Sequence, residues 1–178
     1  MWKNLGWVRV GTLAWISSCG FCVACGSSSD SGASAVLTEA PHCPSGTDAL
    51  KIEGAIGDAV IDDTRTSNLN AGYENIGMPK FSTPLSTLGM LEPNQLPITI
   101  TWAQSLFDGQ TAAITGGTLT LPADQPNAGA TFCISAGEVG FVSGGSEDSA
   151  FKFVVTQVKS GADCSGAATA VDLHGCYQ

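Results

Sequence analysis

Basic side chains are scarce in this chain. Of its 178 residues only 7 are Lys or Arg, against 16 Asp or Glu, which gives a formal net charge of −9 at pH 7. Binding to nucleic acid needs clustered basic side chains that neutralise phosphates, so we expect no nucleic-acid partner. Charged residues of either sign make up only 13%, about half the usual ~25%. Helical bundles and coiled coils are rich in Glu, Lys and Arg, so the composition excludes them too.

Histidines and catalytic motifs are also few. The chain has two histidines. It has no Gly-x-Ser-x-Gly nucleophile motif, no phosphate-binding glycine loop that ends in Lys, and no paired-histidine helix motif. His42, His174 and Asp172 are the residue types that hold a transition metal. We expect them instead to be exposed polar residues near the ends of the domain, and we predict neither a metal site nor a catalytic site.

Two pairs of neighbouring acids are candidates for calcium binding. They are Asp62-Asp63 and Glu147-Asp148. Neither has the alternating Asp/Asn spacing of a calcium loop, so we expect solvated turn residues. No spacing selects the two facing carboxylates that a glycosidase needs.

The first 24 residues have the pattern of an export signal. Residues 1–9 contain Lys3 and Arg9 and no acid, and residues 10–24 carry no charge. A basic start, a short apolar stretch and small residues before a cleavage site are typical of a secretory signal peptide. About fifteen uncharged residues are fewer than the ~20 that a membrane-spanning helix needs, so we expect cleavage.

Three cysteines, Cys19, Cys22 and Cys25, end this segment at intervals of three residues. The spacing matches that of iron–sulfur ligands. Cluster ligands belong to folded domains, however, and these cysteines lie in an apolar export segment. We therefore expect no iron–sulfur cluster.

The junction Val23-Ala24-Cys25-Gly26-Ser27 resembles the processing site of bacterial lipoprotein precursors. The resemblance implies cleavage before Cys25, a diacylglycerol group on its thiol and an acylated new N-terminus. That class prefers Leu where Cys22 stands, and Cys19 is the alternative lipidation site because Ile16-Ser17-Ser18-Cys19 fits the consensus better. Gly26, rather than Asp, after the lipidated cysteine implies sorting to the outer membrane. The domain would then face the periplasm or the cell surface.

A short tether joins the lipidated cysteine to a folded domain. The tether comprises residues 25–41, and the residues after Cys25 are mostly small and polar, which predicts a flexible linker. Residues 42–178 are then left for one domain with one core. Cleavage removes Lys3 and Arg9, so 5 basic and 16 acidic side chains remain and the net charge becomes −11. This charge disfavours electrostatic adhesion to an anionic bilayer. We therefore expect membrane attachment through the acyl chains.

Four cysteines remain in the exported part, and an even number in an oxidising compartment predicts two disulfides. No Cys-x2-Cys spacing of a zinc site occurs among them. A predicted strand over residues 168–173 separates Cys164 from Cys176 by about 20 Å, too far for bridged Cα atoms. We choose Cys43–Cys176, which joins the two ends of the domain, together with Cys133–Cys164.

Short alternating segments between Gly- and Pro-rich turns predict an all-β domain. Gly57-Asp58 suits a type II′ hairpin turn. The expected fold is a disulfide-stapled β-sandwich of about seven to nine short antiparallel strands, and a small β-barrel is the alternative. The strands are expected at residues 49–56, 59–62, near 81, 97–102, 117–121, 131–135, 139–142, 151–159 and 168–173. The expected core contains Ile52, Ile98, Ile100, Trp102, Leu119, Leu121, Phe132, Ile134, Phe153 and Val155.

Candidate binding residues lie in the predicted loops. Trp102 is on the apolar face of its strand, so we expect it in the core rather than on a sugar-binding platform. The long loop from Arg65 to Gln95, with Tyr73 and Glu74, and the turn over residues 143–149 are the candidate binding loops.

The sequence as a whole predicts a membrane-tethered exported lipoprotein with a non-catalytic domain. Apart from the covalent lipid we expect no cofactor. The expected partners are the lipid bilayer, reached through the acyl anchor, and an envelope protein or glycan. The alternative is a carboxylate- or metal-dependent envelope hydrolase, since a site assembled in space is hidden in a single sequence.

Overall fold

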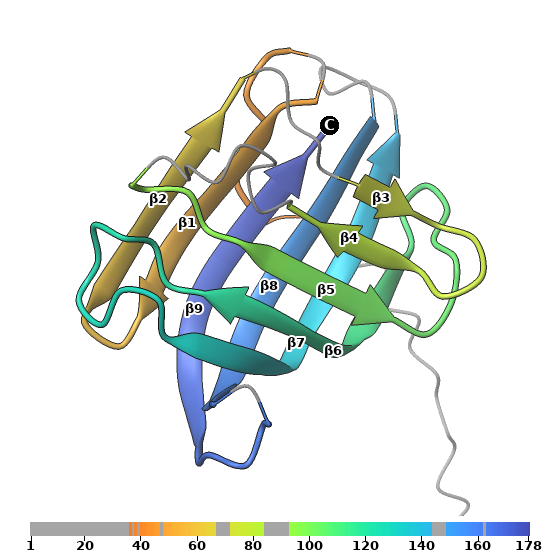
Figure 1. Ribbon diagram of the computed structural model, residues 1–178. Coiled ribbons are helices and arrows are strands. Elements are labelled where there is room, and N and C mark those ends of the chain that lie inside the picture. Colours follow the sequence, from red (N-terminus) through yellow and green to blue (C-terminus); the bar gives the residue numbers. More distant parts are fainter. Residues whose placement is uncertain are drawn as a thin grey trace, which may run out of the picture. The chain divides into compact units, whose positions relative to one another are not determined.

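Nine antiparallel strands form the described part of the chain (Figure 1). The computed structural model describes residues 36, 38, 40–46, 48–66, 72–83, 93–143, 149–161 and 163–178. The predicted signal peptide and Cys25 lie outside the described residues. The strands are β1 (Leu50–Ile56), β2 (Ala59–Arg65), β3 (Gly72–Glu74), β4 (Lys80–Ser82), β5 (Ile98–Trp102), β6 (Thr111–Thr120), β7 (Thr131–Ser143), β8 (Ser149–Ser160) and β9 (Ala168–Tyr177).

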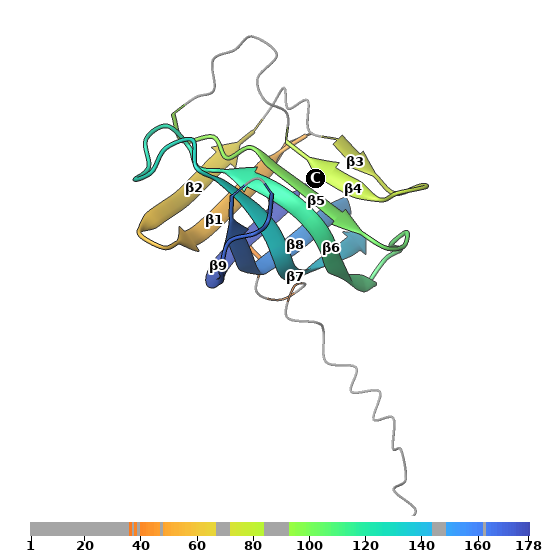
Figure 2. The ribbon, with the colours of Figure 1, turned by 60° about the horizontal axis from the view of Figure 1, so that its bottom comes forward.

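The strands belong to one curled sheet in the order β2-β1-β9-β8-β7-β6-β5-β4-β3. The sheet curls into a half-barrel, so that β3–β6 cross over β7–β9 (Figures 1 and 2). Ring contacts such as Phe81 of β4 on Phe151 of β8, with centroids 5.1 Å apart, join the two halves. The predicted all-β fold of antiparallel strands is confirmed. Its two layers are halves of a single continuous sheet.

Alternation along the strands accounts for the core. Nine of the ten residues expected there are buried, and Phe132 is partly buried against the cluster. Phe81 and Phe151 were not among the residues predicted for the core, yet they are two of its largest fully buried side chains. Gly57, with φ 60°, opens the two-residue turn in which Ile56 pairs with Ala59, so the predicted hairpin is confirmed.

One strand replaces two predicted ones. The segments expected at 131–135 and 139–142 are a single strand, β7, which is bent by register shifts at Ala136 and Gly137. Gly137 has φ 156°, and a Cβ added there would lie 2.3 Å from the carbonyl oxygen of Val154. The bend therefore requires glycine at this position.

Both predicted disulfides are present, Cys43–Cys176 and Cys133–Cys164. The first bond holds the segment before β1 beside the last strand. Val36 and Ala40 in the same segment are buried. Two disulfides indicate an oxidising, non-cytoplasmic compartment. No helix in the described ranges is long and apolar enough to cross a membrane.

A buried ion pair ties the edge strand β2 to the segment before β5. Arg65 donates to Asp63 through Nε at 2.8 Å and through Nη2 at 2.5 Å, and the Leu96 amide donates to the same carboxylate at 2.8 Å. Two expectations are therefore wrong. Arg65 ends β2 instead of opening a long loop, and Asp63 belongs to an interior clamp rather than a solvated turn.

Candidate functional site

The predicted binding residues Tyr73 and Glu74 lie in a strand rather than in a loop. They belong to β3, which pairs with β4 through Tyr73↔Phe81 and Glu74↔Lys80. β3 stands at one end of the sheet order, and the turn from Asn75 to Pro79 joins it to β4. This correction matters for function, because the hairpin forms one wall of a groove.

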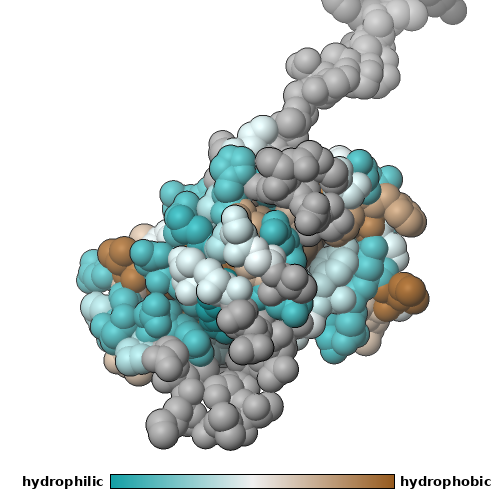
Figure 3. Space-filling model, turned by 90° about the horizontal axis from the view of Figure 1, so that it is seen from above, coloured by the Kyte–Doolittle hydropathy of each residue, from teal (hydrophilic) through white to brown (hydrophobic). Residues whose placement is uncertain are grey.

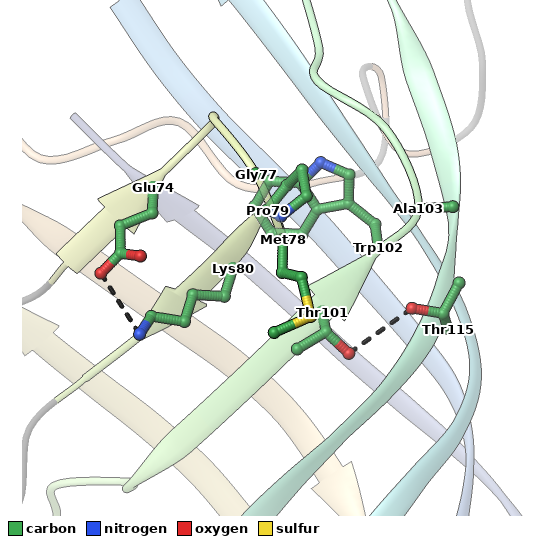
Figure 4. Close-up of a pocket in the computed structure, with 9 residues that line it drawn as sticks. All are labelled: Glu74, Gly77, Met78, Pro79, Lys80, Thr101, Trp102, Ala103 and Thr115. Carbon is green, nitrogen blue, oxygen red and sulfur yellow. Dashed lines mark hydrogen bonds and ion pairs between the residues drawn. The ribbon is translucent and has the colours of Figure 1, made fainter.

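The groove has a volume of about 610 Å³. It lies where the β3–β4 hairpin meets the end of β5, and Figure 4 shows the Met78 side chain extending to Thr101. Its lining residues are Glu74, Gly77, Met78, Pro79, Lys80, Thr101, Trp102, Ala103 and Thr115.

Trp102 forms the apolar floor of this groove. Only 3% of the residue is exposed, because its ring stacks on Tyr73 with centroids 5.8 Å apart and on Phe151 at 5.1 Å. The predicted core position of Trp102 is confirmed. A ring covered in this way offers no open platform for a sugar.

Two polar atoms are buried in the same aromatic cluster. The Trp102 Nε1 and the Tyr73 hydroxyl have no hydrogen-bond partner among the described residues. Burial also raises the pKa of Tyr73 above its ordinary value of 10.0.

The polar rim of the groove is electrically balanced. Lys80 Nζ lies 3.2 Å from the Glu74 carboxylate, as Figure 4 shows. Thr101 donates to the Gly116 carbonyl at 3.0 Å and accepts from Thr115 at 3.5 Å. An apolar floor with a neutral rim suits an uncharged, apolar group better than an ion.

Three exposed apolar side chains lie on the two loops at this end of the domain, and we call them the apolar tip. They are Ile76 and Met78 of the β3–β4 turn, 90% and 87% exposed, and Phe107 of the β5–β6 loop, 67% exposed. Figure 3 shows that apolar residues on the face seen from above lie in separate places at its margins. Because these two loops are hydrogen-bonded to each other, the three exposed side chains are a candidate interaction site.

Asn75 joins the two loops that carry the tip. Its Nδ2 donates to the Leu106 carbonyl at 2.7 Å, and its Oδ1 accepts from the Leu106 amide at 2.8 Å. Ser105 donates to the Asn75 carbonyl. These three bonds connect residues about thirty positions apart and hold both loops in one arrangement.

Two of the three residues considered as metal ligands are in contact. Asp172 and His174 are in contact, with Oδ1 and Nε2 2.5 Å apart, and Asp172 is largely exposed. Within the described residues no three His, Cys, Asp or Glu side chains are grouped so that they can hold a metal ion. His42 therefore does not complete a site with this pair. The acids Glu147 and Asp148 of the predicted 143–149 turn lie outside the described residues.

Sequence reasoning missed Ile76, Met78 and Phe107. The available signal was the apolar content of Asn75-Ile76-Gly77-Met78-Pro79, a segment otherwise typical of a solvated turn. In the comparisons with known proteins, no family model, no curated protein and no solved structure matches the chain.

Proposed function

We propose that the chain is an exported lipoprotein whose β domain is a non-catalytic binding module. In this proposal Cys25 carries the lipid, with Cys19 as the alternative, and the acyl chains hold the protein in the outer membrane. No metal or other cofactor takes part. The domain binds an apolar group of an envelope component in the Trp102 groove.

The groove beside the apolar tip is the observation that carries the proposal. Trp and Met are enriched at the centres of binding interfaces, and here they line a concave site next to exposed Ile76 and Phe107. The paired charges of Glu74 and Lys80 leave no net charge on the rim. Among the expected partners, a glycan fits poorly because the Trp102 ring is covered.

Export is supported by the two disulfides, which require an oxidising compartment. Attachment by lipid is supported by the junction at Cys25 and by the expected net charge of −11, which leaves little electrostatic attraction to an anionic surface. Several acyl chains make such attachment durable.

The test uses the full chain produced in a Gram-negative host. A photo-crosslinking amino acid replaces Thr115, an exposed residue of the groove lining. A matched protein carries it at Val60, which is 67% exposed and lies outside the groove. We expect an adduct with an envelope component from position 115 and none from position 60. Met78→Glu should abolish it, because the substitution places a charge over the apolar floor.

Mass spectrometry of the same membrane fractions tests lipidation. We expect an acylated N-terminal peptide that begins at Cys25, and loss of processing in Cys25→Ser. Acylation at Cys19 would move the site, and unmodified cysteines at both positions would refute the lipoprotein proposal. Equal adducts from positions 115 and 60, or an adduct that survives Met78→Glu, would refute the groove.

A further inference from the structure

The geometry of the apolar tip points to a lipid bilayer as the component that this end of the domain contacts. We propose that Ile76, Met78 and Phe107 insert into the surface of the membrane to which the chain is tethered. The inference rests on the proposed function, because it requires an exported, lipid-anchored chain. It also specifies the envelope component that the proposed function left unnamed.

The first argument is the shape of the tip. Ile76 and Met78 are 90% and 87% exposed at the turn of a hairpin, so they protrude almost without support from the domain. Phe107 protrudes in the same way from the neighbouring loop. Protruding apolar side chains reach an acyl layer through the head groups, as the apolar face of an interfacial helix does.

The second argument is that the tip is fixed before binding. The three hydrogen bonds between Asn75 and the 105–106 segment hold the two loops together. Binding therefore costs little conformational entropy, which is the usual loss when exposed loops become ordered at an interface.

The third argument is charge. The charged groups of the two loops and their strands are Glu74, Lys80 and Asp108. Glu74 and Lys80 neutralise each other, and Asp108 accepts a hydrogen bond from the Ser143 amide at 2.7 Å. With Lys80 as their single basic residue, already paired with Glu74, these two loops and their strands offer no unpaired cation to anionic head groups. The contact must be apolar, so it should favour a zwitterionic surface and resist salt.

The fourth argument is the length of the tether. Eleven positions separate Cys25 from Val36, the first described residue. Such a chain spans at most roughly 40 Å at about 3.6 Å per residue. A site held this close to its target experiences an effective concentration in the millimolar range. Three apolar side chains therefore suffice for docking, although they would bind weakly from free solution.

The experiment places residues 26–178 on vesicles through an N-terminal hexahistidine tag and a nickel-chelating lipid, which imitates the natural anchor. This chain keeps every described strand and both disulfides. Trp102 is its single tryptophan, since Trp2, Trp7 and Trp15 lie before residue 26. The vesicles are phosphatidylcholine with brominated acyl chains, which quench tryptophan fluorescence at short range. Because Met78 and Trp102 line the same groove, quenching of Trp102 reports insertion of the tip.

We expect quenching that persists in high salt and weakens when anionic lipid is added. The triple variant Ile76→Ser, Met78→Ser, Phe107→Ser should lose it. Val60→Ser, which removes an equally exposed apolar side chain away from the tip, should retain it. Far-UV circular dichroism shows that the variants stay folded.

Equal quenching in the wild type and the triple variant, or loss of quenching in high salt, would overturn the lipid contact. The photo-crosslink at position 115 separates the two proposals. A protein adduct there, with no quenching by lipid, leaves the binding module intact and refutes the bilayer as its partner. No adduct of any kind, with no quenching, refutes both.

Discussion

At the scale of single residues, Tyr177 shows how the domain joins its two ends. Its hydroxyl donates to the Asp48 carboxylate at 3.0 Å, just before β1 begins. Its ring lies on Phe81, with centroids 5.4 Å apart. The last residues of β9 therefore connect the start of the domain to the aromatic core.

This environment gives a prediction at alkaline pH. Burial, the hydrogen bond to Asp48 and the charge of that carboxylate raise the pKa of Tyr177 to about 12 from its ordinary 10.0. Between these two values the folded state keeps a proton that the unfolded state has released. The stabilisation from Tyr177 is thus complete below pH 10 and is lost as the pH rises toward 12. Ultraviolet titration of tyrosinate and urea unfolding across this range measure the two effects.

Two variants make this prediction specific. Tyr177→Phe should remove the high-pH titration step and flatten the fall in stability. Asp48→Asn should move the pKa of Tyr177 back toward 10.0, because it removes the carboxylate. A wild-type Tyr177 that titrates at its ordinary pKa would contradict the burial and the contact described here. Tyr73, the other tyrosine of the chain, also has a raised pKa and must be assigned separately.

A second feature at this scale is the buried ion pair between Asp63 and Arg65, which we call the Asp63–Arg65 clamp. Asp63 is fully buried and accepts from both Arg65 and the Leu96 amide. The Leu96 carbonyl accepts from Thr83 at 3.0 Å. Because Thr83 follows β4, the clamp connects edge strand β2 to the strands that carry the groove.

At the scale of elements, β9 passes close to β8 at Gly175. Gly175 pairs with Phe153 on one side and with Ile52 on the other. A Cβ added at Gly175 would lie 2.0 Å from the Phe153 ring, which is fully buried. Glycine here makes room for an aromatic ring in the middle of the sheet.

Gly175→Ala should therefore destabilise the domain by about 1–3 kcal/mol, the usual cost of overpacking a core. Gly72→Ala in β3 is the matched control, because its new Cβ would lie 3.7 Å from Ser82 Oγ in ordinary contact. Urea unfolding of the two variants measures the difference. A second substitution, Phe153→Leu, should recover part of the loss only in the Gly175→Ala background, since neighbouring changes are not additive. Equal stability of the two alanine variants would show that β8 and β9 are less closely packed than described.

At the scale of the whole molecule, two disulfides cross-link a sheet in which the outermost described strands, β2 and β3, are not paired with each other. Cys43–Cys176 closes a sequence separation of 133 residues, and Cys133–Cys164 closes one of 31. The curl brings β3 over the end of β7, where Tyr73 and Phe141 stack with centroids 5.9 Å apart. The groove and the tip exist because of this curl.

The longer loop should contribute more to stability. In the chain-entropy model the ratio of the two loop lengths corresponds to about 1.3 kcal/mol in favour of Cys43–Cys176. The double variant Cys43→Ala, Cys176→Ala should therefore unfold at lower urea than Cys133→Ala, Cys164→Ala. One cysteine of each pair is buried, Cys176 and Cys133, whereas Cys43 is half-buried and Cys164 is exposed. Each double variant therefore removes one buried sulfur, and the two variants serve as controls for each other. If the Cys133→Ala, Cys164→Ala variant unfolded at the lower urea concentration, the disulfides would stabilise the domain through packing in the folded state rather than by restricting the unfolded chain.

The sequence by itself was enough for features that depend on local pattern. Alternation along Ile98–Trp102 and the Gly57-Asp58 turn gave the strand and the hairpin correctly, because side-chain direction in a strand repeats every two residues. The number of cysteines and one distance argument left two disulfide pairings, and the choice of the one that joins the two ends of the domain is confirmed. The signal peptide and the lipidated Cys25 are also local patterns, and they remain predictions.

Tertiary structure alone decided where the groove lies. Apart from the strand expected near residue 81, residues 65–95 were predicted to be a loop, because a three-residue strand such as β3 is too short to show a period. The place of β3 and β4 depends on Phe81 and Tyr73 packing against rings of β7 and β8 far along the chain. Whether Met78 and Phe107 lie near one another depends on Asn75 bonding to Leu106, thirty-one residues away. Such contacts form only when bulges and glycines curl the sheet. The curl is the sum of small twists and bends in many strands, so no single segment of the sequence determines it.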